Sequence, residues 1–200
     1  MKINKIKTFL AALSIGLLSS CVSDDDTKLP EYTPLVFGES FNSGIDNTIL
    51  EIEGWKNYAQ AGTARWKTQV YQNNGYAEFS SFQSGNPSNI GWLISPSINL
   101  DQHQGEKLVF QSAQSYVDNA ANTLEVLISQ NYDGTNVEAA TWQNLSAALP
   151  TLTSPFFAFI NSGQIDLSQY TGNVNIAFRV KGNGTTLDGS YQIDNVRVFY

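Results

Sequence analysis

Few residues of this 200-residue chain have side chains suited to acid–base or nucleophilic chemistry. His103 is the only histidine, and its polar, glutamine-rich surroundings beside Gly105 are typical of a turn. Ser-His-Asp and Cys-His mechanisms need a histidine base, and zinc sites need several His or Cys ligands. The sequence also holds no Gly-Lys-Ser/Thr phosphate loop. Paired acids remain, and Glu51, Glu53 and Glu78 could serve a glycosidase, although no spacing singles out a pair.

Aromatic side chains are the second chemical resource of the chain. Trp55, Tyr58 and Trp66 lie in a stretch rich in Gly, Asn and Gln. An exposed indole or phenol presents an apolar plane with a polar handle, and a sugar ring can stack on it. We take these three residues as candidate ligand-binding residues. The alternative is that they fill the core, where we also expect Trp92 and Trp142.

The only cysteine, Cys21, follows a short apolar run. That run, Phe9 to Leu18, would be about 15 Å long as a helix, too short for a hydrocarbon core of about 30 Å. The residues Leu18-Ser19-Ser20-Cys21 resemble the bacterial lipobox, in which a thiol after two small residues takes the lipid. The sequence thus predicts a lipoprotein signal peptide over residues 1–20 and lipid attachment at Cys21. A buried cysteine is the alternative.

Residues 21–34 indicate a lipidated cysteine followed by a flexible tether, because VSDDDTKLPEYTP holds three adjacent aspartates and two prolines. Ser23 to Asp26 also resemble the acidic surface-export signal of Bacteroidota lipoproteins; the alternative is a solvated spacer. We therefore expect an outer-membrane lipoprotein that is surface-exposed and held to the membrane by its N-terminal lipid.

The net charge and the cysteine content restrict the class of partner and the source of stability. Without Lys2, Lys5 and Lys7, 8 basic side chains remain against 18 acidic ones, a net charge of −10. Such a surface repels phosphate backbones, so no nucleic-acid partner is expected. No second cysteine exists to form an intramolecular disulfide. Stability must therefore come from the core of one domain, which we place at residues 35–200.

From Leu35 onward the dominant hydrophobic period is two, which indicates β-strands. Trp66, Thr68 and Val70 alternate with more polar residues, and apolar residues alternate over 124–128 and 174–180. The turn residues Asn73-Asn74-Gly75 lie between the first of these runs and residues 76–79, which predicts a hairpin. Only Thr141 to Leu149 could hold a short helix. Roughly ten strands with regular turns predict an all-β sandwich.

Four segments carry a resemblance to a known family. They are Phe37-Gly38-Glu39-Ser40-Phe41, Trp92-Leu93-Ile94-Ser95-Pro96, Leu167 to Gly172 with Ile176-Ala177-Phe178-Arg179, and Tyr191-Gln192-Ile193-Asp194-Asn195-Val196. In this order they resemble the choice-of-anchor J and cleaved-adhesin group, which are jelly rolls related to MAM domains and similar to galactose-binding domains. The resemblance implies a jelly-roll β-sandwich and a role in adhesion or carbohydrate capture. The family's Asp/Gly-rich loop after its first strands has no clear counterpart here.

The last segment changes its hydrophobic parity. Tyr191 and Ile193 are apolar at odd positions, whereas Val196 and Val198 are apolar at even positions. The change falls at Asp194-Asn195 and predicts a β-bulge that re-aims a side chain. A strand buried on both faces would give the same pattern.

The family resemblance implies that the first and last strands are neighbours and that a structural Ca²⁺ lies near them. Glu39 and Asp194 would then meet at one end of the sandwich, and Ca²⁺ accepts carboxylate and backbone oxygens in flexible geometry. Asn195 and the loop around Asp46 are further possible oxygen donors. The alternative is a pair of carboxylates that are solvated or hydrogen-bonded to backbone N–H groups.

The sequence therefore predicts a non-catalytic, surface-anchored binding lipoprotein whose ligand is a glycan, by analogy of fold. One alternative is an accessory subunit or adhesin that binds another surface protein. A second is a small glycoside hydrolase. An exposed Trp/Tyr patch would favour the first function, a flat apolar patch or unpaired edge strand the second, and a carboxylate pair in a cleft the third.

Overall fold

The computed structural model describes residues 33–200, which form one compact unit. The predicted signal peptide, the lipid attachment at Cys21 and most of the predicted tether lie outside the described residues. No helix in residues 33–200 is long and apolar enough to cross a membrane.

Strands make up the regular structure of this unit, as the period of two predicts. They are β1 (Leu35–Glu39), β2 (Thr48–Ile49), β3 (Lys56–Ala61), β4 (Lys67–Tyr71), β5 (Asn74–Ser80), β6 (Asn89–Ile94), β7 (Ile98–Asn99), β8 (Lys107–Ser115), β9 (Thr123–Ser129), β10 (Gln143–Asn144), β11 (Ile160–Asn161), β12 (Ile165–Asp166), β13 (Asn173–Gly182) and β14 (Ser190–Phe199).

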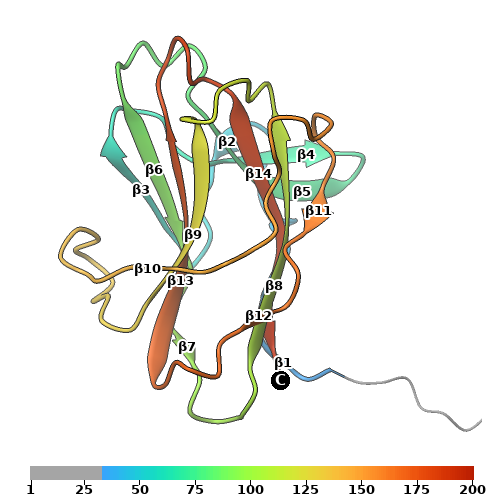
Figure 1. The fold of residues 1–200 in the computed structure, drawn as a ribbon, viewed down its shortest axis with the longest axis vertical. Helices are drawn as coiled ribbons and strands as arrows, with labels where there is room; N and C mark the ends of the chain where they lie inside the picture. The colour runs from blue at the N-terminus through green and yellow to red at the C-terminus, as the bar shows by residue number, and fades with distance from the viewer. Residues whose placement is uncertain (1–32) are drawn as a thin grey trace, which may run out of the picture. The chain divides into compact units, whose positions relative to one another are not determined.

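The strands form two antiparallel sheets packed face to face (Figure 1). The eight-stranded sheet has the order β11-β8-β14-β5-β4-β2, with β1 also pairing β14 and β12 pairing β8. The six-stranded sheet has the order β10-β9-β13-β6-β3, with β7 also pairing β13. The predicted all-β jelly-roll sandwich is confirmed, and most neighbours in each sheet come from distant parts of the sequence.

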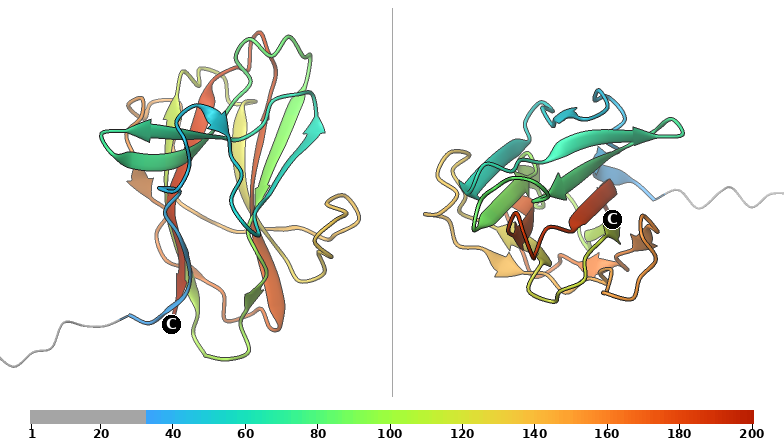
Figure 2. Two further views of the ribbon diagram at one scale, coloured as in Figure 1. Left: turned by 180° about the vertical axis from the view of Figure 1, so that it is seen from behind. Right: turned by 90° about the horizontal axis from the view of Figure 1, so that it is seen from above.

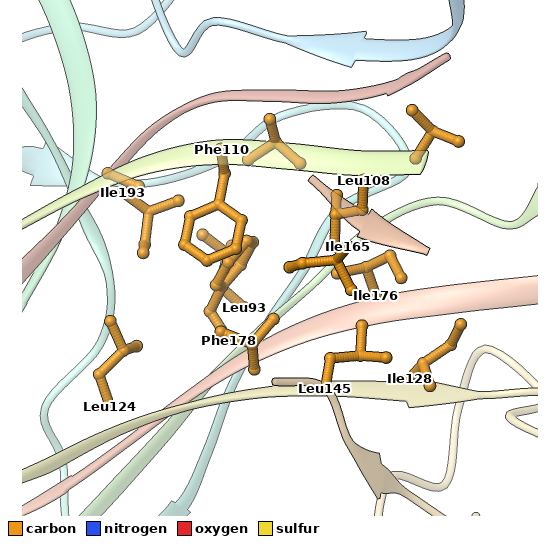
Figure 3. Close-up of a cluster of buried hydrophobic side chains, with 14 of the residues drawn as sticks. Leu93, Leu108, Phe110, Leu124, Ile128, Leu145, Ile165, Ile176, Phe178 and Ile193 are labelled. Carbon is orange, nitrogen blue, oxygen red and sulfur yellow. The ribbon is translucent and has the colours of Figure 1, made fainter. Parts of the chain in front are cut away.

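The main core lies between the two sheets. Figure 3 shows Phe110 of β8 and Phe178 of β13 approaching from opposite layers. Their ring centroids are 5.1 Å apart in an edge-to-face arrangement. Along β8, buried Leu108 and Phe110 alternate with more exposed neighbours, which is the pattern of a strand with one face in the core. Each such side chain contributes about 1.5–3 kcal/mol through burial.

A glycine allows one close contact between the layers. A Cβ built on Gly91 in β6 would lie 1.9 Å from the ring of Phe79 in β5. The missing side chain lets this fully buried ring pack directly against the β6 backbone. Trp66 packs against the same ring, with centroids 5.6 Å apart.

Two local predictions have opposite outcomes. The predicted hairpin is confirmed, because β4 and β5 pair from Lys67↔Glu78 to Tyr71↔Asn74. The possible helix over Thr141 to Leu149 is wrong, because this segment is extended and contains β10. Its backbone hydrogen bonds go to other segments: the amide of Leu145 donates to the Val126 carbonyl, and that of Ala148 to the Ser162 carbonyl.

Candidate functional site: an aromatic-rimmed trough

A row of polar side chains lies on the outer face of the eight-stranded sheet. In β14, Tyr191 and Ile193 belong to the core, so the alternate residues Ser190 and Gln192 lie on the outer face. The register sets Gln192 opposite Glu78 of β5. It sets Ser190 opposite Ser115 of β8. Three neighbouring strands thus contribute polar groups to one floor.

These floor residues form a connected hydrogen-bond network. The Gln192 amide Nε2 donates to Glu78 Oε2 at 2.7 Å, to Ser190 Oγ at 2.9 Å and to Ser115 Oγ at 3.2 Å. The two serine hydroxyl oxygens are 2.6 Å apart. From β4, Gln69 Nε2 donates to the other oxygen of Glu78 at 3.3 Å. Such a network holds its polar groups in fixed positions.

Two adjacent hollows lie over this face, and we call them together the trough. The first hollow has a volume of about 610 Å³ and is lined by Tyr71, Gln72, Asn74, Tyr76, Phe157 and Phe159. The second has a volume of about 520 Å³ and is lined by Glu78, Ser80, Phe82, Ser115, Tyr116, Phe157, Asp188 and Ser190. Both volumes fall within the range of about 300–1,000 Å³ that is usual for ligand sites. Phe157 lines both hollows.

The rim of the trough is aromatic and exposed. Tyr71, Phe82 and Tyr116 expose 67%, 62% and 65% of their surface, and Phe157 exposes 48%. Large apolar side chains gathered at a hollow are a recognised mark of an interaction site. The views in Figures 1 and 2 show the β4–β5 hairpin and the segment leading into β11 on the same side of the molecule.

Two rim residues are held in an unfavourable backbone conformation. Tyr116 and Phe157 have φ angles of 58° and 59°, in the left-handed region that bulky residues avoid. Such a conformation costs about 1–2 kcal/mol per residue. The Phe157 amide donates to the Gln114 carbonyl at 2.8 Å, which fixes this backbone in place. Strain of this kind concentrates at binding sites.

The first hollow lies beside the bulge in β14. Asp194 pairs with Gln111 and Arg197 with Val109, so two residues of β14 face one residue of β8, and Asn195 has a φ of 51°. The parity change therefore marks a β-bulge, as predicted. Asp194 is buried, and its Oδ2 accepts from Asn74 Nδ2 at 2.9 Å.

Burial raises the pKa of the Asp194 carboxyl, although the hydrogen bonds from Asn74 and the Asn195 amide act in the opposite direction. The ion pairs described within residues 33–200 involve Glu125 with Arg179 and Lys181, so none of them neutralises Asp194. A buried carboxylate of this kind would be a favourable oxygen ligand for a cation.

The two predicted metal ligands lie on neighbouring strands. β1 pairs β14, which confirms that the first and last strands are adjacent, and Glu39 lies opposite Val196. Each carboxylate accepts a backbone N–H: Glu39 Oε1 from Phe41 at 2.7 Å, and Asp194 Oδ1 from Asn195 at 2.6 Å. Over residues 33–200 no group of three or more His, Cys, Asp or Glu side chains gathers as a metal site.

The other oxygen donors suggested for calcium make local contacts. Asp46 Oδ1 accepts from the Val70 amide at 2.8 Å, and Asn195 Nδ2 donates to Gln111 Oε1 at 2.9 Å. A cation at Asp194 would thus depend on backbone and amide oxygens in addition to the carboxylates. Calcium binding there stays a prediction.

The aromatic residues singled out in the sequence do not line the trough. Trp66 is fully buried, so its prediction as a ligand-binding residue is wrong: an indole inside the core cannot reach a ligand. Trp55 packs on Phe41 with centroids 5.3 Å apart. Tyr58 belongs to the six-stranded sheet and donates its hydroxyl to Glu138 Oε1 at 2.9 Å.

The three glutamates considered for a glycosidase do not share one hollow. Glu51 and Glu53 line a hollow of about 420 Å³ that is distinct from the trough, where Glu78 lies. His103 lies in the turn region between β7 and β8, where its ring stacks on Tyr200 with centroids 3.7 Å apart.

The family model described as Domain of unknown function (DUF5017) matches residues 56–200. The chain belongs to this family. No functionally curated protein matches the chain in sequence. The DUF5017 segment includes β3 to β14, and therefore the whole lining of the trough.

Solved structures show the fold of this domain. The K1 cleaved adhesin domain of Lys-gingipain from Porphyromonas gingivalis W83 matches with a TM-score of 0.51 and 19% identity, over 81% of this chain and 96% of that chain. The K2 cleaved adhesin domain of Lys-gingipain matches with a TM-score of 0.52 and 15% identity, over 82% and 98%. The domain is a cleaved-adhesin-like jelly roll, as the sequence motifs predict.

Proposed function

We propose that this protein is a non-catalytic carbohydrate-binding lipoprotein that holds a glycan in the trough. The arrangement that carries the proposal is the exposed aromatic rim around a polar floor. A sugar ring has apolar faces that stack on aromatic planes and hydroxyl groups that hydrogen-bond to fixed polar partners. The strained backbone at Tyr116 and Phe157 supports the proposal, since it keeps two rings at the edge of the hollows.

The domain organisation belongs to the same proposal. Residues 1–20 would direct secretion, Cys21 would carry the lipid, and residues 22–34 would link it to the jelly roll on the outer membrane surface. Inhibition of the lipoprotein signal peptidase by globomycin should make the uncleaved precursor accumulate. Normal maturation in its presence would contradict the lipoprotein assignment.

The test of glycan binding uses residues 22–200, the expected mature chain without its lipidated cysteine. We expect binding on a glycan array, followed by measurable heat with the best ligands in titration calorimetry. Tyr116→Ala should weaken that affinity about tenfold, which corresponds to about 1.4 kcal/mol. Tyr200→Ala is the matched control, because Tyr200 is an exposed aromatic residue that stacks on His103 outside the trough.

The outcomes separate the functions. An equal loss of glycan affinity in Tyr116→Ala and Tyr200→Ala would show a general effect of removing an aromatic side chain. That result would contradict a binding site in the trough. A blank array beside specific capture of a purified surface protein would instead favour the adhesin. Release of reducing ends from a bound glycan would favour the hydrolase.

A further inference from the structure

The charged groups that line the trough are all acidic. Glu78 and Asp188 line the second hollow, and the first hollow has no charged lining residue. Behind the first hollow, the buried Asp194 carboxylate is linked to its lining through Asn74. A ligand in either hollow therefore meets carboxylates or neutral groups.

Two cationic side chains line a third hollow next to the trough, and both donate hydrogen bonds to other partners. Arg65 and Lys67 line this hollow of about 460 Å³, which also contacts Glu78. The Arg65 guanidinium donates to the Asn57 carbonyl at 2.7 Å. The Lys67 ammonium donates to Asn47 Oδ1 at 3.0 Å. Lys67 lies opposite Glu78 in the β4–β5 pairing, but the ion pairs described within residues 33–200 do not include these two side chains. Neither Arg65 nor Lys67 lines the two hollows of the trough, so the charged residues in its lining are acidic.

The hydrogen bonds that the Glu78 carboxylate accepts come from neutral donors. Glu78 accepts from the amides of Gln69 and Gln192 and from the Ser190 hydroxyl. In such a setting a carboxylate acts as an acceptor for neutral N–H and O–H groups, of which a neutral sugar supplies many. A ligand carboxylate beside Glu78 and Asp188 would instead meet like charges across a partly desolvated site.

The two hollows also indicate a ligand longer than one sugar. Phe157 belongs to both linings, so one molecule that fills both hollows would contact this residue. The combined lining extends from Tyr71 at the β4–β5 turn to Tyr116 at the end of β8. A chain of sugar units matches this extended form.

Resting on the proposed function, we propose that the trough selects an uncharged polysaccharide chain and rejects acidic polysaccharides, with Glu78 and Asp188 as the selecting residues. The selection is electrostatic, so it should be strongest at low ionic strength. The Debye length is about 30 Å at 0.01 M salt and about 8 Å at 0.15 M.

The experiment compares each polysaccharide with its own acidic form. Mannan, galactan and β-glucan are used before and after oxidation of their primary alcohols to carboxylates, with chain length matched, and affinity for residues 22–200 is measured by calorimetry. For the polysaccharides that bind, we expect the neutral form to bind at least tenfold more tightly at 0.01 M salt. The ratio should fall as salt is raised.

Variants assign the selection to the trough. Asp188→Asn should reduce the ratio of neutral to acidic affinity at least threefold, because one repelling charge is removed. Asp133→Asn is the matched control, since Asp133 is an exposed aspartate outside the trough, and it should leave the ratio unchanged. An unchanged ratio in Asp188→Asn would overturn the assignment.

Failure of this inference is distinguishable from failure of the proposed function. Equal binding of neutral and oxidised chains, or tighter binding of the oxidised chain, would overturn the charge selection while leaving glycan binding intact. Absence of binding to the neutral and acidic forms alike would overturn both.

Discussion

The outer faces of the two sheets carry similar aromatic residues with opposite arrangements. On the six-stranded sheet, Trp92 packs on Trp142 with centroids 5.2 Å apart, and Tyr132 packs on Trp142 at 5.6 Å. The Arg179 guanidinium lies 4.8 Å from the centre of the Trp92 ring. The segment that carries Tyr132 and Trp142 thus packs onto this face, and these rings form a second core.

On the eight-stranded sheet the aromatic residues stand around a hollow and the polar groups lie beneath them. Tyr116 and Phe157 are exposed, whereas Gln192 and Ser115 are buried. The difference teaches that residue type does not decide whether an aromatic ring packs into the fold or stays open to solvent. What decides is whether another segment of the chain covers the ring.

The largest expected effect concerns the covered face. Trp92→Ala should destabilise the domain by about 3–5 kcal/mol, because the ring is almost completely buried and donates its Nε1 to Gln60 Oε1. Tyr116→Ala should cost less than about 1 kcal/mol, since its ring is mostly solvated. Urea unfolding of both variants measures the contrast. Similar losses of stability in Trp92→Ala and Tyr116→Ala would contradict the distinction between the outer faces of the two sheets.

The second prediction separates strain from binding at Phe157. Glycine adopts a positive φ without steric cost, so Phe157→Gly should be more stable than Phe157→Ala by about 1 kcal/mol. Both variants should lose about tenfold or more in affinity for the glycan that binds, because both lack the ring. Calorimetry and thermal melts measure the two quantities. Full affinity in either variant would exclude this ring from the site.

The third prediction concerns an ion-pair cluster on the covered face. Glu125 receives Arg179 Nε at 2.6 Å and Lys181 Nζ at 3.0 Å. Burial alone would raise the pKa of Glu125, but the hydrogen bonds and charges of Arg179 and Lys181 lower it further than burial raises it. The folded-state pKa is therefore below the unfolded value. The stabilisation that ionised Glu125 gives the folded chain is fully present above the unfolded-state pKa. It is lost as the pH falls through the folded-state pKa.

Glu125→Gln should consequently cost about 0.5–1 kcal/mol at pH 7. The difference from the parent chain should shrink as the pH falls below 4.5, the ordinary value for this group. Urea unfolding at a series of pH values measures it, with exposed Glu51→Gln as control. A difference that grows toward acid pH would contradict the assignment of the lowered pKa.

The smallest expected effect concerns calcium binding at Asp194, beside the bulge in β14. A site with few acidic ligands falls in the weak, millimolar class of extracellular modules. A calcium concentration equal to Kd stabilises the folded chain by about 0.4 kcal/mol. Thermal melts of residues 22–200 in EDTA and in rising calcium measure this gain. A melting temperature that stays constant up to tens of millimolar calcium would argue against the ion, as would an equal gain in Asp194→Ala.

The sequence predicts the fold further than it predicts the site. Alternation along 124–128 and 174–180 corresponds to β9 and β13, and the parity change in the last segment corresponds to the bulge. These signals are local, because each strand with one buried face carries its own pattern. The short helix that Thr141 to Leu149 could have held does not form. Trp142 and Leu145 have helix-like spacing, but they pack into different clusters.

The trough depends on pairing between distant strands. Its lining residues come from separate segments, for example Tyr76, Tyr116 and Phe157. No local sequence pattern indicates that these residues lie close together. One signal was present: Tyr76 shares the parity of Glu78, whereas Ala77 and Phe79 occupy the core face. That parity assigns Tyr76 to the outer face of its hairpin. The prediction for Trp66 is wrong because polar neighbours in the sequence do not determine whether a side chain is covered.

The pairing of β1 with β14 also has a mechanical consequence. The chain enters the sheet at Leu35, opposite Phe199, whereas Ser190 at the other end of β14 lines the trough. At about 3.3 Å per residue these ends of β14 are about 30 Å apart. Tension between the incoming chain and a captured ligand would therefore run along the paired strands. The hydrogen bonds between β1 and β14 would bear that load together, in shear, and could not open one after another.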